Sequence, residues 1–169
     1  TGRSGFSGEF GHFSVFDNEI ICRCGKKGCL ETEVSGSALH RILCEKVKNG
    51  QSSILSKRIL TGETSLTLEE IVDATNKEDI LCIELVEEIG RKLGRYLAGL
   101  INLFNPELVV IGGTLALTED YILQPIKTAI RKYSLNLVSK DSAVVLSKLQ
   151  AKAGVIGACL LSRSKLFEW

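Results

Sequence analysis

Methionine is absent from all 169 residues, and the chain opens at Thr1 in a run rich in glycine and serine. A soluble enzyme rarely begins inside such a loop, so we expect the chain to be the C-terminal piece of a longer protein. Catalytic groups that lie upstream in the longer protein are then lacking here. The opening itself, residues 1–8, could form an anion-binding loop of backbone N–H groups or a flexible terminus.

Long apolar runs and an excess of charge of either sign are also lacking. No stretch reaches the roughly 20 apolar residues of a membrane-spanning helix, and 21 basic residues against 20 acidic ones leave a net charge of +1. Without a large basic field, DNA binding is expected only through a missing N-terminal domain, and no membrane contact is expected. Hydrophobic residues at 44% and charged residues at 24% are typical of a soluble globular domain, assigned to residues 1–169.

Nothing in the sequence resembles a signal peptide, so the six cysteines are predicted to be reduced in the cytoplasm rather than paired. Cys44, Cys82 and Cys159 lie within apolar helical patterns, where a free cysteine packs as a small hydrophobic side chain. The other three cysteines lie close together in the sequence and form a separate group.

This group is Cys22, Cys24 and Cys29, with His12 ten residues upstream of its first member. Glycines between the last two cysteines allow the backbone to wrap around one ion. Three thiolates and one imidazole are the ligand set of a closed, tetrahedral structural zinc site. The alternatives are reduced, buried thiols or halves of unrelated disulfides.

Two carboxylates flank the same residues. Glu9 lies three residues before His12, and Glu31 lies two residues after Cys29. If the loop over residues 9–31 folds back on the metal, both carboxylates and the free nitrogen of the imidazole come together. Such a set suits a ligand rich in hydroxyl groups. The alternative is that both carboxylates are ordinary solvated charges.

The segment Glu9 to His12 and the loop Cys22 to Glu31 resemble the signature of the ROK proteins, a family of sugar-responsive repressors and sugar kinases. The resemblance implies an α/β fold, the C-terminal lobe of an actin-like or ribonuclease H-like sugar kinase fold with an inserted zinc loop. In that family the positions matching His12, Cys22, Cys24 and Cys29 hold a structural zinc, and those matching Glu9, His12 and Glu31 bind sugar hydroxyls.

Apolar periodicity predicts the remaining elements. The expected strands are 10–16, 19–22, 108–111 and 143–146, the expected helices are about 38–47, 67–74, 78–104, 120–133 and 153–161, and residues 54–60 are expected to form a short helix or a turn. The α/β core spans about 78–163, and helix 153–161 is expected to close the fold. The run over 108–111 is expected to be buried on both faces.

Local signals predict where some helices begin and how they pack. Thr67 with Glu70 predicts a capping box, and Thr118 or Asp120 is expected to cap the helix that follows. The long helix carries an apolar stripe from Cys82 to Phe104 and i,i+4 ion pairs. Its glycines at 90, 94 and 99 are interpreted as points of close packing against another backbone or as part of an inter-subunit face, with chance as the alternative.

Gly112 and Gly113 follow strand 108–111 at the end where α/β sheets place ligands. The resemblance implies that this turn, with residues 102–107, is the family's adenosine side, so both glycines are candidate nucleotide-binding residues. Thr114 stands where family kinases usually carry a further glycine. This departure favours the non-catalytic branch of the family.

Three functions remain open. In the first, the chain is the effector-sensing and dimerising part of a sugar-responsive regulator. In the second, it is the C-terminal lobe of an ATP- and Mg²⁺-dependent sugar kinase; the family's catalytic aspartate lies upstream, so this chain alone is expected to be inactive. In the third, it is a zinc-stapled scaffold for self-association. The expected partners are a small sugar of unspecified stereochemistry and further copies of the chain.

Overall fold

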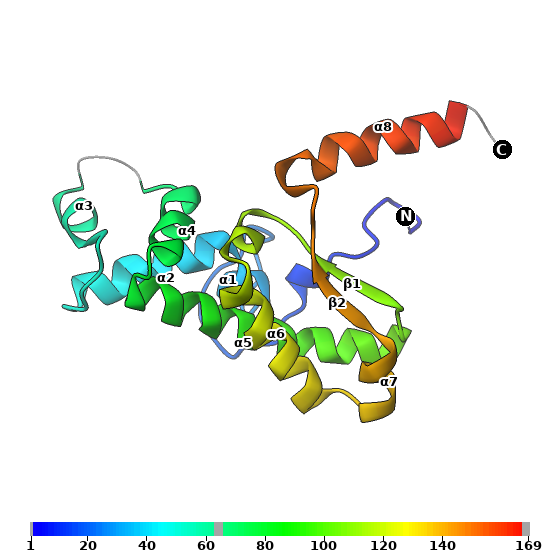
Figure 1. The fold of residues 1–169 in the computed structure, drawn as a ribbon, viewed down its shortest axis with the longest axis horizontal. Coiled ribbons are helices and arrows are strands. Elements are labelled where there is room, and N and C mark those ends of the chain that lie inside the picture. The colour runs from blue at the N-terminus through cyan, green and yellow to red at the C-terminus, as the bar shows by residue number, and fades with distance from the viewer. Residues whose placement is uncertain (1, 63–65, 167–169) are drawn as a thin grey trace.

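The computed structural model describes residues 2–62 and 66–166, so Thr1 of the glycine-rich opening lies outside the described residues (Figure 1). Helices predominate. The elements in chain order are η1 (Phe10–His12), α1 (Glu31–Val34), α2 (Gly36–Lys48), α3 (Ser56–Thr61), α4 (Leu68–Asn76), α5 (Ile80–Phe104), β1 (Leu108–Ile111), η2 (Thr114–Thr118), α6 (Asp120–Tyr133), α7 (Asn136–Asp141), β2 (Ala143–Leu146), η3 (Gln150–Lys152) and α8 (Ala153–Leu166). None of these helices is both long enough and apolar enough to cross a membrane.

The long helix α5 is the centre of the molecule, and α6 packs along it. The two helices meet at backbone distance because glycine occupies the contact points. A Cβ at Gly90 would lie 2.9 Å from the Ile122 carbonyl oxygen, and one at Gly94 would lie 2.8 Å from the Ala129 Cβ. The predicted close packing is confirmed at these two positions. Gly99 makes no such contact within the described chain and faces open space, so for this glycine the inter-subunit face stays a prediction.

The hydrophobic core lies between α5 and the helices around it. Its fully buried members from different helices are Leu39, Leu43, Ile71, Val86, Ile89, Ile122 and Ile126. The predicted stripe on α5 holds as far as Leu97, because its earlier members are buried or pack against the core. In the last turns Ile101 is buried and Phe104 is 70% exposed. The glycines, and not the largest side chains, determine which face of α5 contacts α6.

Strands β1 and β2 form a parallel pair with Leu108 opposite Ala143. This supports the expected α/β class, yet the prediction that 108–111 is buried on both faces is wrong. Val109 and Ile111 pack against the core, whereas Leu108 and Val110 are more than half exposed. Within the described residues the sheet has two strands and only one covered face, so alternate side chains point outward.

The caps confirm one prediction and overturn another. Thr67 and Glu70 form the full capping box of α4. The prediction that Thr118 or Asp120 caps α6 is wrong, since Glu119 holds the N-cap position with φ +49° and makes no side-chain cap bond. The Thr118 hydroxyl instead donates to the Leu115 carbonyl oxygen at 2.8 Å, which keeps it inside η2.

Two of the expected elements differ from the prediction. The predicted strand over 10–16 begins with the 3-10 turn η1, and residues 19–22 form no regular strand; isolated bridges join Ser14 to Cys29 and Ile21 to Lys27. The last helix, α8, forms but does not close the fold. None of its described side chains is buried, and it stands apart from the helical body (Figure 1).

The three cysteines outside the loop differ in burial. Cys82 is fully buried, as predicted, and burial raises the pKa of its thiol to about 12. Cys44 is half-buried. The packing role expected for Cys159 is wrong, because this residue lies exposed on α8.

Candidate metal and ligand centre

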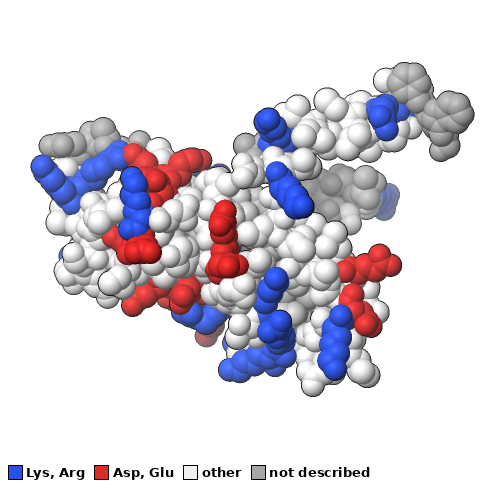
Figure 2. Space-filling view, viewed as in Figure 1, with Lys and Arg blue, Asp and Glu red and all other residues white. Residues whose placement is uncertain are grey.

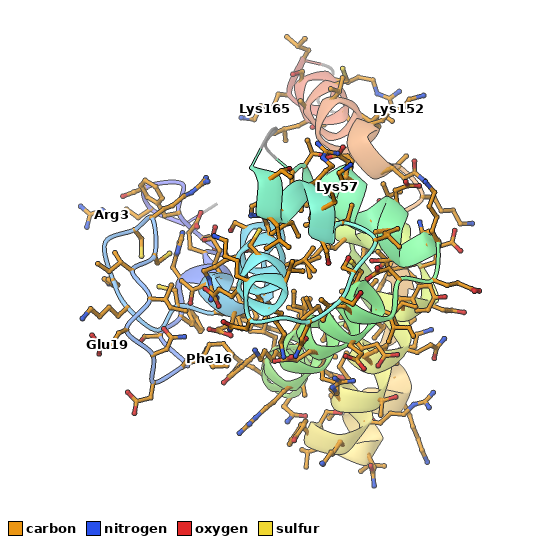
Figure 3. The ribbon with its side chains drawn as sticks, turned by 90° about the vertical axis from the view of Figure 1, so that its left-hand side faces the viewer. Arg3, Phe16, Glu19, Lys57, Lys152 and Lys165 are labelled. Carbon is orange, nitrogen blue, oxygen red and sulfur yellow. The ribbon has the colours of Figure 1, made fainter. Side chains whose placement is uncertain are left out.

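The site lies in the N-terminal loop segment, which carries Arg3, Phe16 and Glu19 and stands beside the helical body (Figure 3). Backbone hydrogen bonds fold the loop back on itself. The Val15 N–H donates to the Gly28 carbonyl oxygen at 2.8 Å, and the Leu30 N–H donates to the Phe13 carbonyl oxygen at 2.9 Å. The return requires Gly28, which has φ +74° and whose Cβ would collide with the Phe16 carbonyl oxygen.

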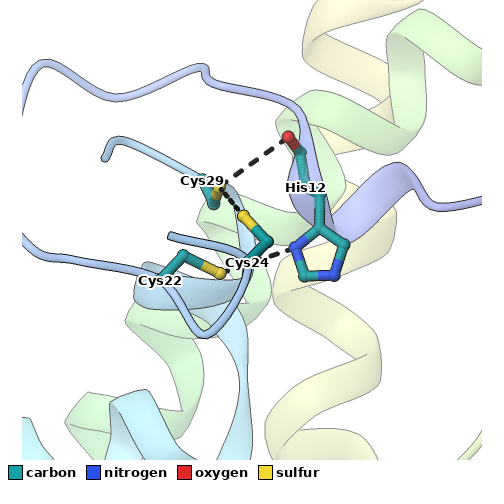
Figure 4. Close-up of side chains that lie close together, drawn as sticks. All are labelled: His12, Cys22, Cys24 and Cys29. Atoms are coloured by element: carbon teal, nitrogen blue, oxygen red, sulfur yellow. Dashed lines mark hydrogen bonds between the residues drawn. The ribbon is translucent and has the colours of Figure 1, made fainter. Parts of the chain in front are cut away.

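This fold-back brings the four predicted ligands together (Figure 4). One donor atom from each of His12, Cys22, Cys24 and Cys29 lies within 4.8 Å of every other. The Cys22 Sγ is 3.5 Å from the His12 Nδ1, and the Cys24 Sγ is 3.6 Å from the Cys29 Sγ. Each separation is close to the edge of about 3.7 Å that a tetrahedron of thiolates at the usual zinc–sulfur distance would have.

The cysteines are reduced in this structure and lie at different depths. Cys29 is fully buried and Cys24 is exposed. Desolvation and the neighbouring thiols raise the pKa of Cys29 to about 12. A hydrogen bond from the Lys26 backbone lowers the pKa of Cys24. Holding all three sulfurs as thiolates would require a cation, and the soft donor set and its spacing fit a divalent metal such as zinc.

The two predicted sugar-binding carboxylates lie on either side of His12. The Glu31 Oε2 is 3.5 Å from its Nδ1, and the Glu9 Oε2 is 3.6 Å from its Nε2. Because Nδ1 faces the Cys22 thiol, the Nε2 side of the ring remains for a ligand. The structure therefore brings all six residues of the two candidate sets into one locality.

A pocket of about 210 Å³ adjoins this locality. Polar groups lining it include those of Arg23, Glu31, Thr32, Ser37 and Arg41. The hydroxyls and guanidinium groups add donors beside the Glu31 acceptor, a mixture that can hydrogen-bond a polyhydroxy ligand.

Sequence reasoning missed the residues that hold this loop against α5. Glu33, 14% exposed in its side chain, accepts from the Lys92 Nζ at 2.8 Å and from the Asn18 Nδ2 at 3.0 Å. The Tyr96 hydroxyl donates to the Val15 carbonyl oxygen at 3.1 Å. These partners lie far apart in sequence. The only local signal for them is the acidic residue Glu33, two places after Glu31.

The two candidate nucleotide-binding glycines lie elsewhere, at the carboxyl end of β1. The Ser147 N–H, just after β2, donates to the Ile111 carbonyl oxygen at 2.8 Å. Gly113 has φ +86° and ψ 176°, a conformation that side chains disfavour. Thr114 is the first residue of η2, so a 3-10 helix begins directly after the two glycines.

Comparison with known proteins gives one family. A family model described as the ROK family matches residues 1–165. The glucokinase of Thermotoga maritima is 31% identical over 166 residues, which cover 98% of this chain and 52% of that protein. The DNA-binding transcriptional dual regulator NagC of Escherichia coli is 33% identical over 165 residues, which cover 98% of this chain and 39% of that protein.

The similar solved structures also include both a transcriptional regulator and a glucokinase. A ROK family transcriptional regulator, a homologue of the Escherichia coli MLC protein, superposes with a TM-score of 0.79 at 30% identity, covering 92% of this chain and 38% of that one. A ROK family glucokinase from Streptomyces griseus, in complex with glucose and AMPPNP, gives a TM-score of 0.77 at 29% identity, covering 94% and 52%. The chain thus spans between about two fifths and half of the length of these relatives.

Proposed function

The chain belongs to the ROK family, and from that premise we propose that it is the effector-sensing, dimerising C-terminal region of a sugar-responsive transcriptional regulator. In this function a sugar binds beside a structural zinc. The observation that carries the proposal is the position of His12, with one ring nitrogen 3.5 Å from the Cys22 thiol and the other 3.6 Å from the Glu9 carboxylate.

Zinc would be held by the Nδ1 of His12 and the thiolates of Cys22, Cys24 and Cys29, the four groups whose donor atoms converge. With all four positions filled by protein, such an ion supplies rigidity to the loop rather than a reactive water. His12, coordinating through Nδ1, would carry its proton on Nε2 and so present an N–H to the ligand.

The carboxylates of Glu9 and Glu31 would accept hydrogen bonds from neighbouring sugar hydroxyls, while the His12 N–H donates to a third oxygen. Charged acceptors make these bonds strong. A pocket built this way discriminates against analogues without the hydroxyl groups, since a carboxylate would then be left unpaired. This chemistry positions a sugar and moves no proton from it.

Regulation follows if the sugar binds one arrangement of the whole protein more tightly than another. That difference in affinity would shift the relative placement of DNA-binding domains supplied elsewhere in the protein. The DNA-binding relative NagC supports this function. Thr114, the first residue of η2, supports it as well, because a β-branched side chain there disfavours close approach of the backbone to a nucleotide.

The second candidate is the C-terminal lobe of an ATP-dependent sugar kinase. It is favoured by the glucokinase relative at 31% identity and by the strand end at Gly112 and Gly113. In this function the two glycines would approach the nucleotide, and Mg²⁺ and a catalytic base would come from the rest of the protein.

Calorimetric titration of the full-length parent protein with a panel of neutral sugars tests the shared sugar site. We expect one sugar to bind, and the variants Glu9→Gln and Glu31→Gln each to weaken that binding at least tenfold. Glu69→Gln, a control at an exposed position on α4, should bind like the unchanged protein. If no sugar binds, or if all three variants bind equally, the site proposal fails.

The same preparation separates the two functions. A regulator should release its DNA operator when the sugar is added and should leave ATP intact. Sugar-dependent ATP consumption without DNA binding would instead establish the kinase.

A further inference from the structure

A second pocket, of about 330 Å³, lies in the groove between α5 and α6, and no residue of the His12 cluster lines it. Its lining residues are Arg91, Lys92 and Arg95 from α5 and Thr128, Ala129, Lys132 and Tyr133 from α6. Four of these seven side chains are cationic and none is acidic. The volume is at the lower end of the range for small-molecule sites.

Two of the cations are neutralised by their own helix. The Arg91 Nη1 lies 3.3 Å from the Glu87 carboxylate, and the Lys92 Nζ lies 2.9 Å from the Glu88 carboxylate. These are ordinary i,i+4 pairs on a helix surface. These two ion pairs account for Arg91 and Lys92, which leaves Arg95 and Lys132 to be explained.

Arg95 and Lys132 form no ion pair within the described part of the chain. Both lie instead over one aromatic ring: the Arg95 Cζ is 5.3 Å and the Lys132 Nζ is 5.4 Å from the centroid of Tyr133. Each cation is thus within cation–π range of the same ring, and neither has an acidic partner among the described residues. An anion in this pocket would supply the missing negative charge.

The helix packing sets this arrangement. Because α5 and α6 touch at Gly94 and Ala129, the residues beside these two positions on both helices line one pocket. Figure 2 shows Lys and Arg side chains gathered over the C-terminal end of α6. The cations therefore come from two helices that are fixed relative to each other, which makes the pocket pre-organised for a compact anion.

We propose that this pocket binds the phosphoryl group of a small phosphorylated molecule. Arg95 offers a planar, bidentate donor and Lys132 a point charge, while the Thr128 hydroxyl donates from the same side. The partly exposed Tyr133 ring packs against the organic part of the ligand. This site is separate from the sugar site and does not depend on it.

Calorimetric titration with pyrophosphate at low ionic strength tests the proposal on the purified protein. We expect one binding site per chain, and we expect the double variant Arg95→Gln with Lys132→Gln to weaken binding at least about tenfold. The matched control, Arg163→Gln with Lys165→Gln, removes the same charge from exposed positions on α8 and should change the affinity less than about twofold. If the double variant is unfolded by circular dichroism, the exposed Lys132→Gln variant alone carries the comparison.

Three outcomes would overturn the proposal. The first is the absence of saturable binding of pyrophosphate. The second is equal weakening in both double variants, which would indicate only non-specific attraction to positive charge. The third is a change in oligomeric state on removal of Arg95 and Lys132 with pyrophosphate binding unchanged, since the pocket would then belong to a contact between copies of the chain.

Discussion

The Nζ of Lys92 on α5 lies 2.8 Å from the Glu33 carboxylate on α1, although the two residues are 59 positions apart. Glu33 lies two residues after Glu31 on the same short helix. This ion pair therefore fixes the position of α1, and with it the Glu31 carboxylate, relative to α5. Burial acts to lower the pKa of Lys92, but the carboxylates of Glu33 and Glu88 outweigh it and hold that pKa above its ordinary value. The lysine therefore stays charged at neutral pH.

Replacing Glu33 with Gln should destabilise the protein by about 1–3 kcal/mol, because the half-buried Lys92 ammonium loses its partner across the interface. Sugar affinity of the parent should fall as well, since α1 is no longer held in place. Urea denaturation and calorimetry measure the two effects. The control Glu87→Gln breaks an exposed pair with Arg91 and should cost less than about 0.5 kcal/mol; equal losses in both variants would contradict the assigned role of Glu33.

Elemental analysis of the purified protein should give about one zinc per chain, and Cys24→Ser should lose it. We expect a chelator to lower the melting temperature, because a bound ion stabilises the folded state and the loop closes on it. Cys159→Ser, which removes an exposed thiol on α8, is the control and should retain the metal. Full metal content in the Cys24→Ser protein would contradict the ligand assignment.

Gly94 and Gly99 lie on the same helix but should respond in opposite ways to alanine. Gly94→Ala places a methyl group against α6 and should destabilise the protein by about 1–3 kcal/mol or more. Gly99→Ala enters open space and should stabilise it by up to about 1 kcal/mol through helix propensity. Denaturant midpoints measured side by side decide the matter, and a neutral Gly94→Ala would show that the helices do not meet as described.

Asp79 links the loop before α3 to the start of α5. Its carboxylate accepts from the Ile54 N–H at 2.7 Å and from the Cys82 N–H at 2.9 Å. Burial acts to raise the pKa of Asp79, and these two donors outweigh it and hold the pKa below its ordinary range. Asp79→Ala should therefore destabilise the protein by about 2 kcal/mol at neutral pH.

The pH dependence of this effect follows from the direction of the shift. Because folding lowers the pKa of Asp79, its stabilisation is fully present above the ordinary aspartate pKa of about 3.9 and is lost as the pH falls toward the folded value. The gap in unfolding free energy between the native protein and Asp79→Ala should narrow over that window. Asp73→Ala, at an exposed pair with Lys77, should show almost no gap at any pH.

Spacing in the sequence was enough to predict the candidate ligands, because one short loop carries them all. The four donor groups and both carboxylates converge through turns that glycine permits, and Gly28 shows the requirement directly. Whether zinc and a sugar occupy this locality stays a prediction. The apolar period of α5 and the capping box at Thr67 are local signals too, and the structure contains both elements.

Long-range contacts explain most of the differences. Residues 10–16 alternate as a strand would, but the 3-10 turn at Phe10–His12 forms where the chain wraps toward Glu31. The burial of β1 depends on which strands lie beside it, which no pattern within 108–111 can specify. Helix α8 is apolar through Leu161 and polar from Ser162 to Lys165, so its sequence contains no single apolar face that would indicate where it packs.

The glycine contacts between α5 and α6 have a mechanical consequence. Close packing at these contacts leaves no room for one helix to slide along the other without breaking the fit. We expect α5 and α6 to move as one rigid unit. Any change that displaced Glu33 from Lys92 would then shift both helices together rather than α5 alone.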